Sequence, residues 1–158
     1  MTKRIFFAIL IMVLSISGAM AETVFISLLE QSSDGEFHNF ESSSAWEAGV
    51  LDALFDLGAI VSNTPIQTKD AFVLDEALRS AKEGGASSVL VVELDYKVIP
   101  TKDIKNRPAP VTIHFTLYET DSGTIKNELK YIQQDPSLNA EEDKQRAVEQ
   151  TRRLFLNK

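Results

Sequence analysis

The sequence predicts an α/β domain with a mixed sheet of about five strands and helices packed on the sheet. Two helix–glycine–alanine–strand units follow one another, LFDLGAIV at residues 54–61 and AKEGGASSVLVV at residues 81–92. Residues 111–119 alternate apolar and polar side chains, and a turn at 120–123 leads to a returning strand at 124–133. The order strand–helix–strand–helix–strand–strand–strand–helix implies parallel pairing in the first half of the sheet and antiparallel pairing in the second.

The first half of the chain supplies three strands and two helices. Residues 23–29 are rich in β-branched and apolar side chains, and residues 30–41 follow as a polar loop. The serines at 42–44 offer N-cap oxygens for a helix, with Glu47 at capping-box spacing from Ser44. Gly58 ends this helix, and residues 59–62 begin a short strand. Residues 70–83 repeat the helical pattern, and Gly84-Gly85 end that helix before a strand at 88–99.

The second half begins with a proline-rich loop at residues 100–110, between the strands at 88–99 and 111–119. Asn139 is expected to cap the last helix, because Glu142 lies three residues further on. The core stripe of this helix is expected to contain Ala140, Ala147, Val148, Leu154 and Phe155.

The first 21 residues are typical of a secretory signal peptide. Lys3 and Arg4 precede an almost entirely apolar stretch at residues 5–16, and the small-residue pattern that ends at Ala21 predicts cleavage after that residue. An uncleaved anchor helix is the alternative, but the apolar stretch is shorter than the ~20 residues of a membrane span. We therefore expect a single domain at residues 22–158 in the periplasm or outside the cell. The chain has no cysteine, so neither a disulfide nor a lipid-modified cysteine is expected.

Charge and glycine placement argue against several functions. The formal charge of −7 becomes −9 when Lys3 and Arg4 are removed, which disfavours nucleic acid and anionic membranes as partners. A phosphate-binding loop needs the order strand, glycines, helix, whereas Gly84-Gly85 follow a helix and precede a strand. We expect no cofactor and, since the chain has no nucleophile elbow, no serine-hydrolase chemistry.

The polar segment at residues 30–41 carries the candidate residues for chemistry. Glu30, Asp34, Glu36 and His38 follow the first strand, and ligand sites of open α/β sheets collect at the carboxyl ends of strands. These groups could hold a metal ion, or two carboxylates could act as an acid–base pair in a small hydrolase. The alternative is a solvated acidic loop, because the spacing matches neither a zinc motif nor an EF-hand.

Other polar and aromatic residues have simpler interpretations. His114 has no identified partner, so we expect a half-exposed histidine on a strand. Trp46 is expected to be buried or half-buried rather than an exposed binding aromatic.

A basic island interrupts the acidic chain between the two middle strands. Lys102, Lys105 and Arg107 lie in the proline-rich loop. They could dock an anionic or protein partner, and the alternative is a solubilising hairpin tip.

Three stretches together resemble one family. LFDLGAIV, AKEGGASSVLVVELDY and FTLYETDSGTI, in this order, resemble the small bacterial envelope α/β domain found at the amino terminus of TolB, in LpoB and in CsgG-like secretion proteins. The resemblance implies a non-enzymatic protein that docks to an envelope partner, and it carries no catalytic residues over to this chain. A small hydrolase using the loop at residues 30–41 and a binder of small ligands remain as alternatives.

Overall fold

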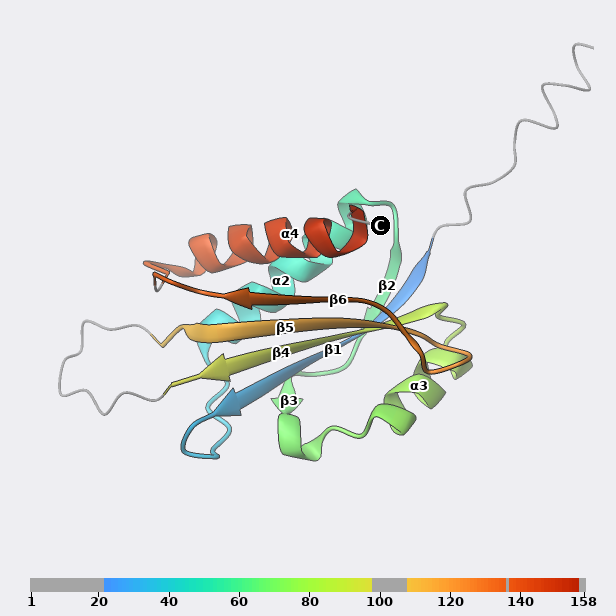
Figure 1. The fold of residues 1–158 in the computed structure, drawn as a ribbon, viewed down its shortest axis with the longest axis horizontal. Helices are drawn as coiled ribbons and strands as arrows, with labels where there is room; N and C mark the ends of the chain where they lie inside the picture. Colours follow the sequence, from blue (N-terminus) through green and yellow to red (C-terminus); the bar gives the residue numbers. More distant parts are fainter. Residues whose placement is uncertain (1–21, 98–107, 136, 157–158) are drawn as a thin grey trace, which may run out of the picture.

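The computed structural model describes residues 22–97, 108–135 and 137–156, and within them an open sheet is covered by helices on both faces (Figure 1). The elements in chain order are β1 (Thr23–Ser32), α2 (Glu41–Asp56), β2 (Ile60–Asn63), β3 (Gln67–Thr68), the 3₁₀ turn η1 (Lys69–Ala71), α3 (Leu74–Glu83), β4 (Ser88–Tyr96), β5 (Pro110–Glu119), β6 (Ile125–Ile132) and α4 (Ala140–Leu156). The predicted mixed α/β fold is confirmed. The proposed signal peptide at 1–21 and most of the loop at 100–110 lie outside the described residues.

The sheet has parallel and antiparallel halves, as the order of elements predicts. Its strand order is β2-β1-β4-β5-β6, with β3 paired to β1 beyond the end of β2. β2, β3 and β4 are parallel to β1, whereas β5 is antiparallel to β4 and to β6. The sixth strand, beyond the five expected, is β3, which has only two residues.

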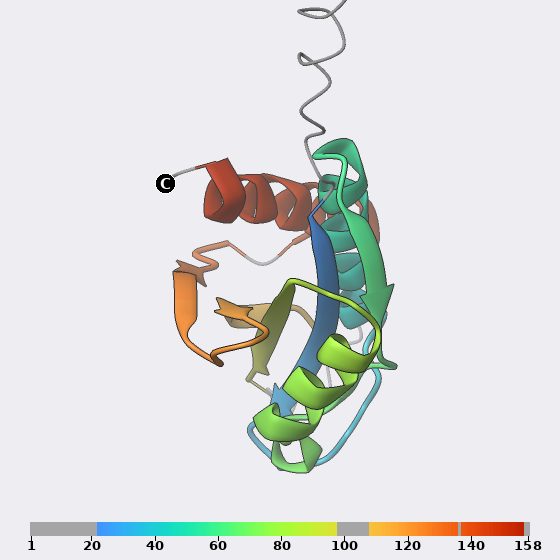
Figure 2. The ribbon, with the colours of Figure 1, turned by 90° about the vertical axis from the view of Figure 1, so that its right-hand side faces the viewer.

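Two apolar layers pack on opposite faces of the sheet, and Figure 2 shows the helices that cover these two faces. The larger core lies under α2 and α4, and its members come mainly from alternate positions of β1, β4 and β5. The smaller core lies under α3 and includes Phe25, Leu29, Ala77, Ala81, Ala86, Val89 and Val91. β4 contributes to both layers, because Val89–Val92 are buried on both sides, as the continuous apolar run predicts.

The helices α2 and α4 run side by side in the same direction (Figure 1). Trp46 near the start of α2 contacts Asp143 near the start of α4, and Asp56 at the end of α2 contacts Arg152 in the last turns of α4. Gly49 marks their closest approach: a Cβ there would lie 2.3 Å from the carbonyl oxygen of Lys144. This role of Gly49 was not predicted from the sequence.

In both predicted helix–glycine–alanine–strand units, the helix ends in a Schellman motif. Gly58 and Gly85 have φ of 78° and 73°, a region that glycine enters at low cost. The N–H of Ala59 donates to the carbonyl of Leu54, and the N–H of Ala86 donates to the carbonyl of Ala81. Glycine is therefore needed at Gly85, whereas Gly84 keeps a helical φ of −78°.

Several boundaries of helices and strands differ from the prediction, two of them near the polar segment at residues 30–41, which we call the acidic loop. β1 continues to Ser32, so Glu30 is a strand residue and not a loop residue. α2 starts at Glu41, ahead of Ser44, and Glu47 accepts a hydrogen bond from Asn63 instead of closing a capping box. The prediction failed here because the segment before the helix is held by a distant side chain, Glu30, as described below. α3 likewise starts at Leu74, after η1, and not at residue 70. No helix within the described residues has the length and apolar character of a membrane span.

Candidate functional site

Glu30 is a buried carboxylate that holds the start of α2. It follows Val24, Ile26 and Leu28 at every second position of β1, so its side chain enters the same layer as theirs. Its Oε1 accepts the backbone N–H groups of His38 and Asn39, at 2.9 and 3.1 Å. Its Oε2 accepts the N–H of Phe40 at 3.2 Å and the hydroxyl of Ser43 at 2.7 Å.

These four hydrogen bonds fix the segment that leads into α2: three of the donors precede the helix, and the fourth, the Ser43 hydroxyl, lies in its first turn. The first N–H groups of a helix lack intrahelical partners, and a negative charge near them is favourable. Asn39 has a φ of 50°, a left-handed conformation that asparagine tolerates, and the N–H groups on either side of it converge on Glu30. Glu30 is thus fully engaged in holding the segment from His38 to Ser43, and we assign it a structural role.

Tyr96 extends this network into the core. Its hydroxyl lies 2.8 Å from the hydroxyls of both Ser42 and Ser43, and its ring packs against Phe40 with centroids 4.4 Å apart. Burial raises the pKa of the Tyr96 phenol well above its usual value, so the group stays neutral. This network was not predicted from the sequence. The period-two pattern, continued past Leu29, would have placed Glu30 on the buried face.

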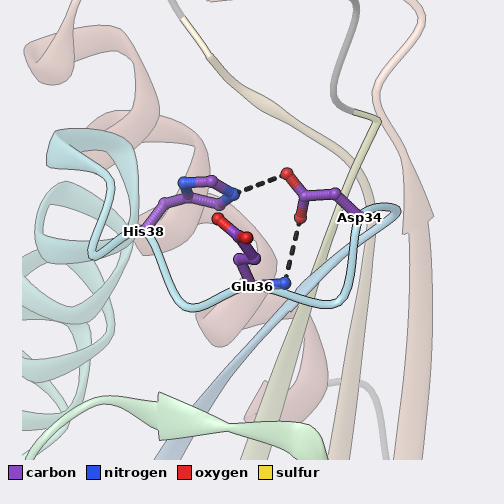
Figure 3. Close-up of side chains that lie close together, drawn as sticks. All are labelled: Asp34, Glu36 and His38. Carbon is purple, nitrogen blue, oxygen red and sulfur yellow. Dashed lines mark hydrogen bonds and ion pairs between the residues drawn. The ribbon is translucent and has the colours of Figure 1, made fainter.

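Asp34, Glu36 and His38 converge outside the sheet, in the loop between β1 and α2 (Figure 3). Asp34 Oδ1 accepts the backbone N–H of Glu36 at 3.0 Å, and Asp34 Oδ2 lies 2.9 Å from Nε2 of His38. One ligand atom from each of the three side chains lies within 4.8 Å of the others, and all three residues are exposed. Glu30, predicted together with these three residues, does not join their cluster, because its buried carboxylate bonds the backbone N–H of His38 and not the imidazole.

The electrostatics of this loop favour an anionic Asp34. The Ser32 hydroxyl beside it, the N–H of Glu36 and the imidazole of His38 lower the pKa of Asp34 to about 2. Two carboxylates and one imidazole are ligands that Zn²⁺ and similar divalent cations accept. The loop can therefore offer a cation three ligands and leave its remaining positions to water.

The other residues named from the sequence have separate surroundings. His114 is half-exposed on β5, as expected, opposite Glu93 of β4. Trp46 is fully buried, also as expected, and its Nε1 donates to Oδ1 of the buried Asp143 at 3.2 Å. Lys102, Lys105 and Arg107 lie outside the described residues, between Tyr96 and Pro110, which pair with each other.

Comparisons with known proteins find solved structures with a similar fold but do not assign the chain to a family. No protein-family model matches this chain, and no curated protein matches it. Among solved structures, a dodecamer of a PelC variant from Paraburkholderia phytofirmans is similar, with a TM-score of 0.53 and 14% identity over 85% of this chain and 89% of that chain. Lipoprotein GNA1162 from Neisseria meningitidis is similar with a TM-score of 0.51 and 13% identity, over 75% of this chain and 85% of that chain.

The LpoB C-terminal domain from Salmonella enterica is a weaker match, with a TM-score of 0.48 and 16% identity over 78% of this chain and 90% of that chain. At these identities the PelC and GNA1162 matches concern the fold alone. Both matches agree with the mixed α/β fold that the order of elements predicts.

Proposed function

We propose that this chain is a non-catalytic protein-interaction domain of the bacterial cell envelope, an accessory or assembly factor that is exported through its N-terminal segment. The observation that carries the proposal is the fold, which the chain shares with the PelC dodecamer and the lipoprotein GNA1162. The PelC match further supports a role in which such a domain assembles with other protein chains. The signal-peptide pattern of residues 1–21 supports export.

Two buried acidic side chains have structural partners, which also favours a non-catalytic role. Glu30 accepts four hydrogen bonds, and Asp143 accepts one from Trp46. A hydrolase built on the loop at residues 30–41 would need Glu30 free to exchange a proton or to meet a substrate. Its four donors and its burial oppose that use.

The partner surface that we propose is the basic segment containing Lys102, Lys105 and Arg107. The strands that flank it end beside the acidic loop, because the N–H of Ser33 donates to the carbonyl of Tyr96 at 3.1 Å. Three cations within six residues on a chain of net charge −7 form a local charge contrast that an acidic partner surface would complement.

The test is cross-linked capture from a bacterial envelope extract, followed by identification of the captured protein. Replacing Lys102, Lys105 and Arg107 together by Glu should abolish capture, while circular dichroism stays unchanged. The matched control reverses the exposed cations Arg79, Lys82 and Lys130 to Glu and should capture as the natural chain does. Equal capture by both variants would show that the basic segment is not the docking surface.

A second candidate function is binding of a divalent cation by Asp34, Glu36 and His38. The observation in its favour is the convergence of their three ligand atoms within 4.8 Å. Calorimetry with Zn²⁺ should show one site, lost in His38→Ala and retained in the neighbouring Gln31→Ala, because Gln31 is exposed but has no place in the cluster. Equal heats for the natural chain and His38→Ala would refute the site.

A further inference from the structure

One end of the molecule gathers exposed apolar side chains around the point where the chain enters the domain. Ile60 donates its N–H to the carbonyl of Glu22, the first described residue, at 2.9 Å. At the same end, the Glu22 carboxylate accepts a hydrogen bond from Nζ of Lys126 in β6, at 3.2 Å. Figure 1 draws this end at the right, and Figure 2 turns it toward the reader.

Two more contacts bring the helix ends to the same place. The last residue of α2, Asp56, accepts a hydrogen bond from Arg152 of α4 at 2.6 Å. At the start of β6, Asn127 donates to the carbonyl of Leu154, in the last turn of α4. The ends of α2 and α4 and the starts of β1, β2 and β6 therefore lie at the same end of the molecule, with β2 and β6 at opposite edges of the sheet.

Large apolar side chains at this end of the molecule are exposed to solvent. We call them the apolar end; its members are Phe55, Leu57, Ile60, Ile125 and Leu156. Four of the five are more than half exposed, at 55–66% of their surface, and Leu57 is 38% exposed. Several exposed apolar side chains on one surface mark an interaction site more often than single scattered ones do.

The sequence that precedes Glu22 indicates what kind of partner the apolar end contacts. Residues 5–16 are almost entirely apolar, and only five residues, 17–21, separate them from the domain. Five extended residues span about 17 Å. Whenever residues 5–16 lie in a bilayer, Glu22 at the start of the domain is therefore held within about that distance of the lipid, and the end of the domain that contains Glu22 faces the bilayer.

We propose that the apolar end is a lipid-facing surface, which rests against a bilayer while the N-terminal segment is in the membrane and binds the bilayer reversibly after cleavage. Apolar side chains that enter the boundary between headgroups and acyl chains lose contact with water, which favours binding. The net negative charge of the domain would weaken binding to anionic lipid, so we expect uncharged phosphatidylcholine vesicles to bind better than phosphatidylglycerol vesicles. This inference does not rest on the proposed protein partner.

The first test uses vesicle sedimentation of the processed chain, produced from the whole sequence and with its N-terminus verified by mass spectrometry. Replacing Phe55, Ile60 and Leu156 together by Ser should lower the partition coefficient for phosphatidylcholine vesicles by about tenfold or more, equivalent to about 1.4 kcal/mol. The chain offers a matched control of the same residue types at the opposite end: Phe37, Ile132 and Leu138, exposed to 47%, 62% and 85%. Their replacement by Ser should leave partition unchanged within about twofold. Equal loss in both variants would overturn the proposal.

The second test does not depend on cleavage. Because the chain has no cysteine, a single-cysteine variant can be labelled selectively with a dye whose emission shifts to the blue in lipid. The label on Ile60→Cys should shift when phosphatidylcholine vesicles are added, and the label on Ile132→Cys should not. A shift on Ile60→Cys that follows protein concentration without vesicles would assign the surface to a second copy of the chain instead. No shift under either condition would overturn the lipid assignment.

Discussion

Replacing Glu30 by Gln tests whether one strand carboxylate holds the start of α2. The substitution keeps the shape of the side chain but removes its charge and turns one acceptor oxygen into a donor. The hydroxyl of Ser43 can rotate to accept from that new donor, whereas the N–H of Phe40 then has nothing to donate to. The remaining bonds, to the N–H groups of His38 and Asn39, become neutral and weaker.

The expected magnitude follows from these losses. A buried N–H without an acceptor costs about 1–3 kcal/mol, and bonds to a charged group exceed neutral ones by about 1 kcal/mol each. We expect the free energy of unfolding to fall by about 3–5 kcal/mol in Glu30→Gln. Urea unfolding at neutral pH, followed by circular dichroism, measures this change.

The control is Glu36→Gln, which makes the same chemical change at an exposed position six residues along the chain. Its free energy of unfolding should stay within about 0.5 kcal/mol of the natural chain. If Glu30→Gln is no more destabilising than this control, the four hydrogen bonds do not support the helix and the reasoning is wrong.

Three further expectations concern the helix contact, a helix end and the acidic loop. Gly49→Ala should lower the free energy of unfolding by about 2 kcal/mol or more, since its Cβ would lie 2.3 Å from the Lys144 carbonyl; unchanged urea unfolding would contradict the close approach. Gly85→Ala should cost about 1 kcal/mol more than Gly84→Ala, because only Gly85 is left-handed; equal midpoints would refute this. The lowered pKa of Asp34 stabilises the folded state fully above about pH 4, the unfolded value, and this contribution disappears as the pH falls toward 2. The stability difference between the natural chain and Asp34→Asn should therefore shrink as the pH falls from about 4 through 2, and a difference that does not change over this range would contradict the prediction.

Local patterns were sufficient to predict most of the elements. The two glycine–alanine joints predicted both helix ends, because a Schellman motif is formed by neighbouring residues alone. The capping of α4 by Asn139 was predicted for the same reason, and its Oδ1 accepts the N–H of Glu142 at 2.9 Å. The apolar run in β4 correctly indicated a strand that is covered on both faces.

The sequence by itself determined the order of elements, the mixed sheet and the loop in which Asp34, Glu36 and His38 lie close together, because these depend on residues a few positions apart. The tertiary structure decided the role of Glu30, whose charge in a polar stretch suggested chemistry until its burial under four donors showed a structural use. It also decided the need for a glycine at residue 49 and the gathering of the apolar end. Those features join segments up to about a hundred residues apart, as the contact between Glu22 and Lys126 does. Contacts of that kind are set by how the layers pack, which no local pattern of side chains encodes.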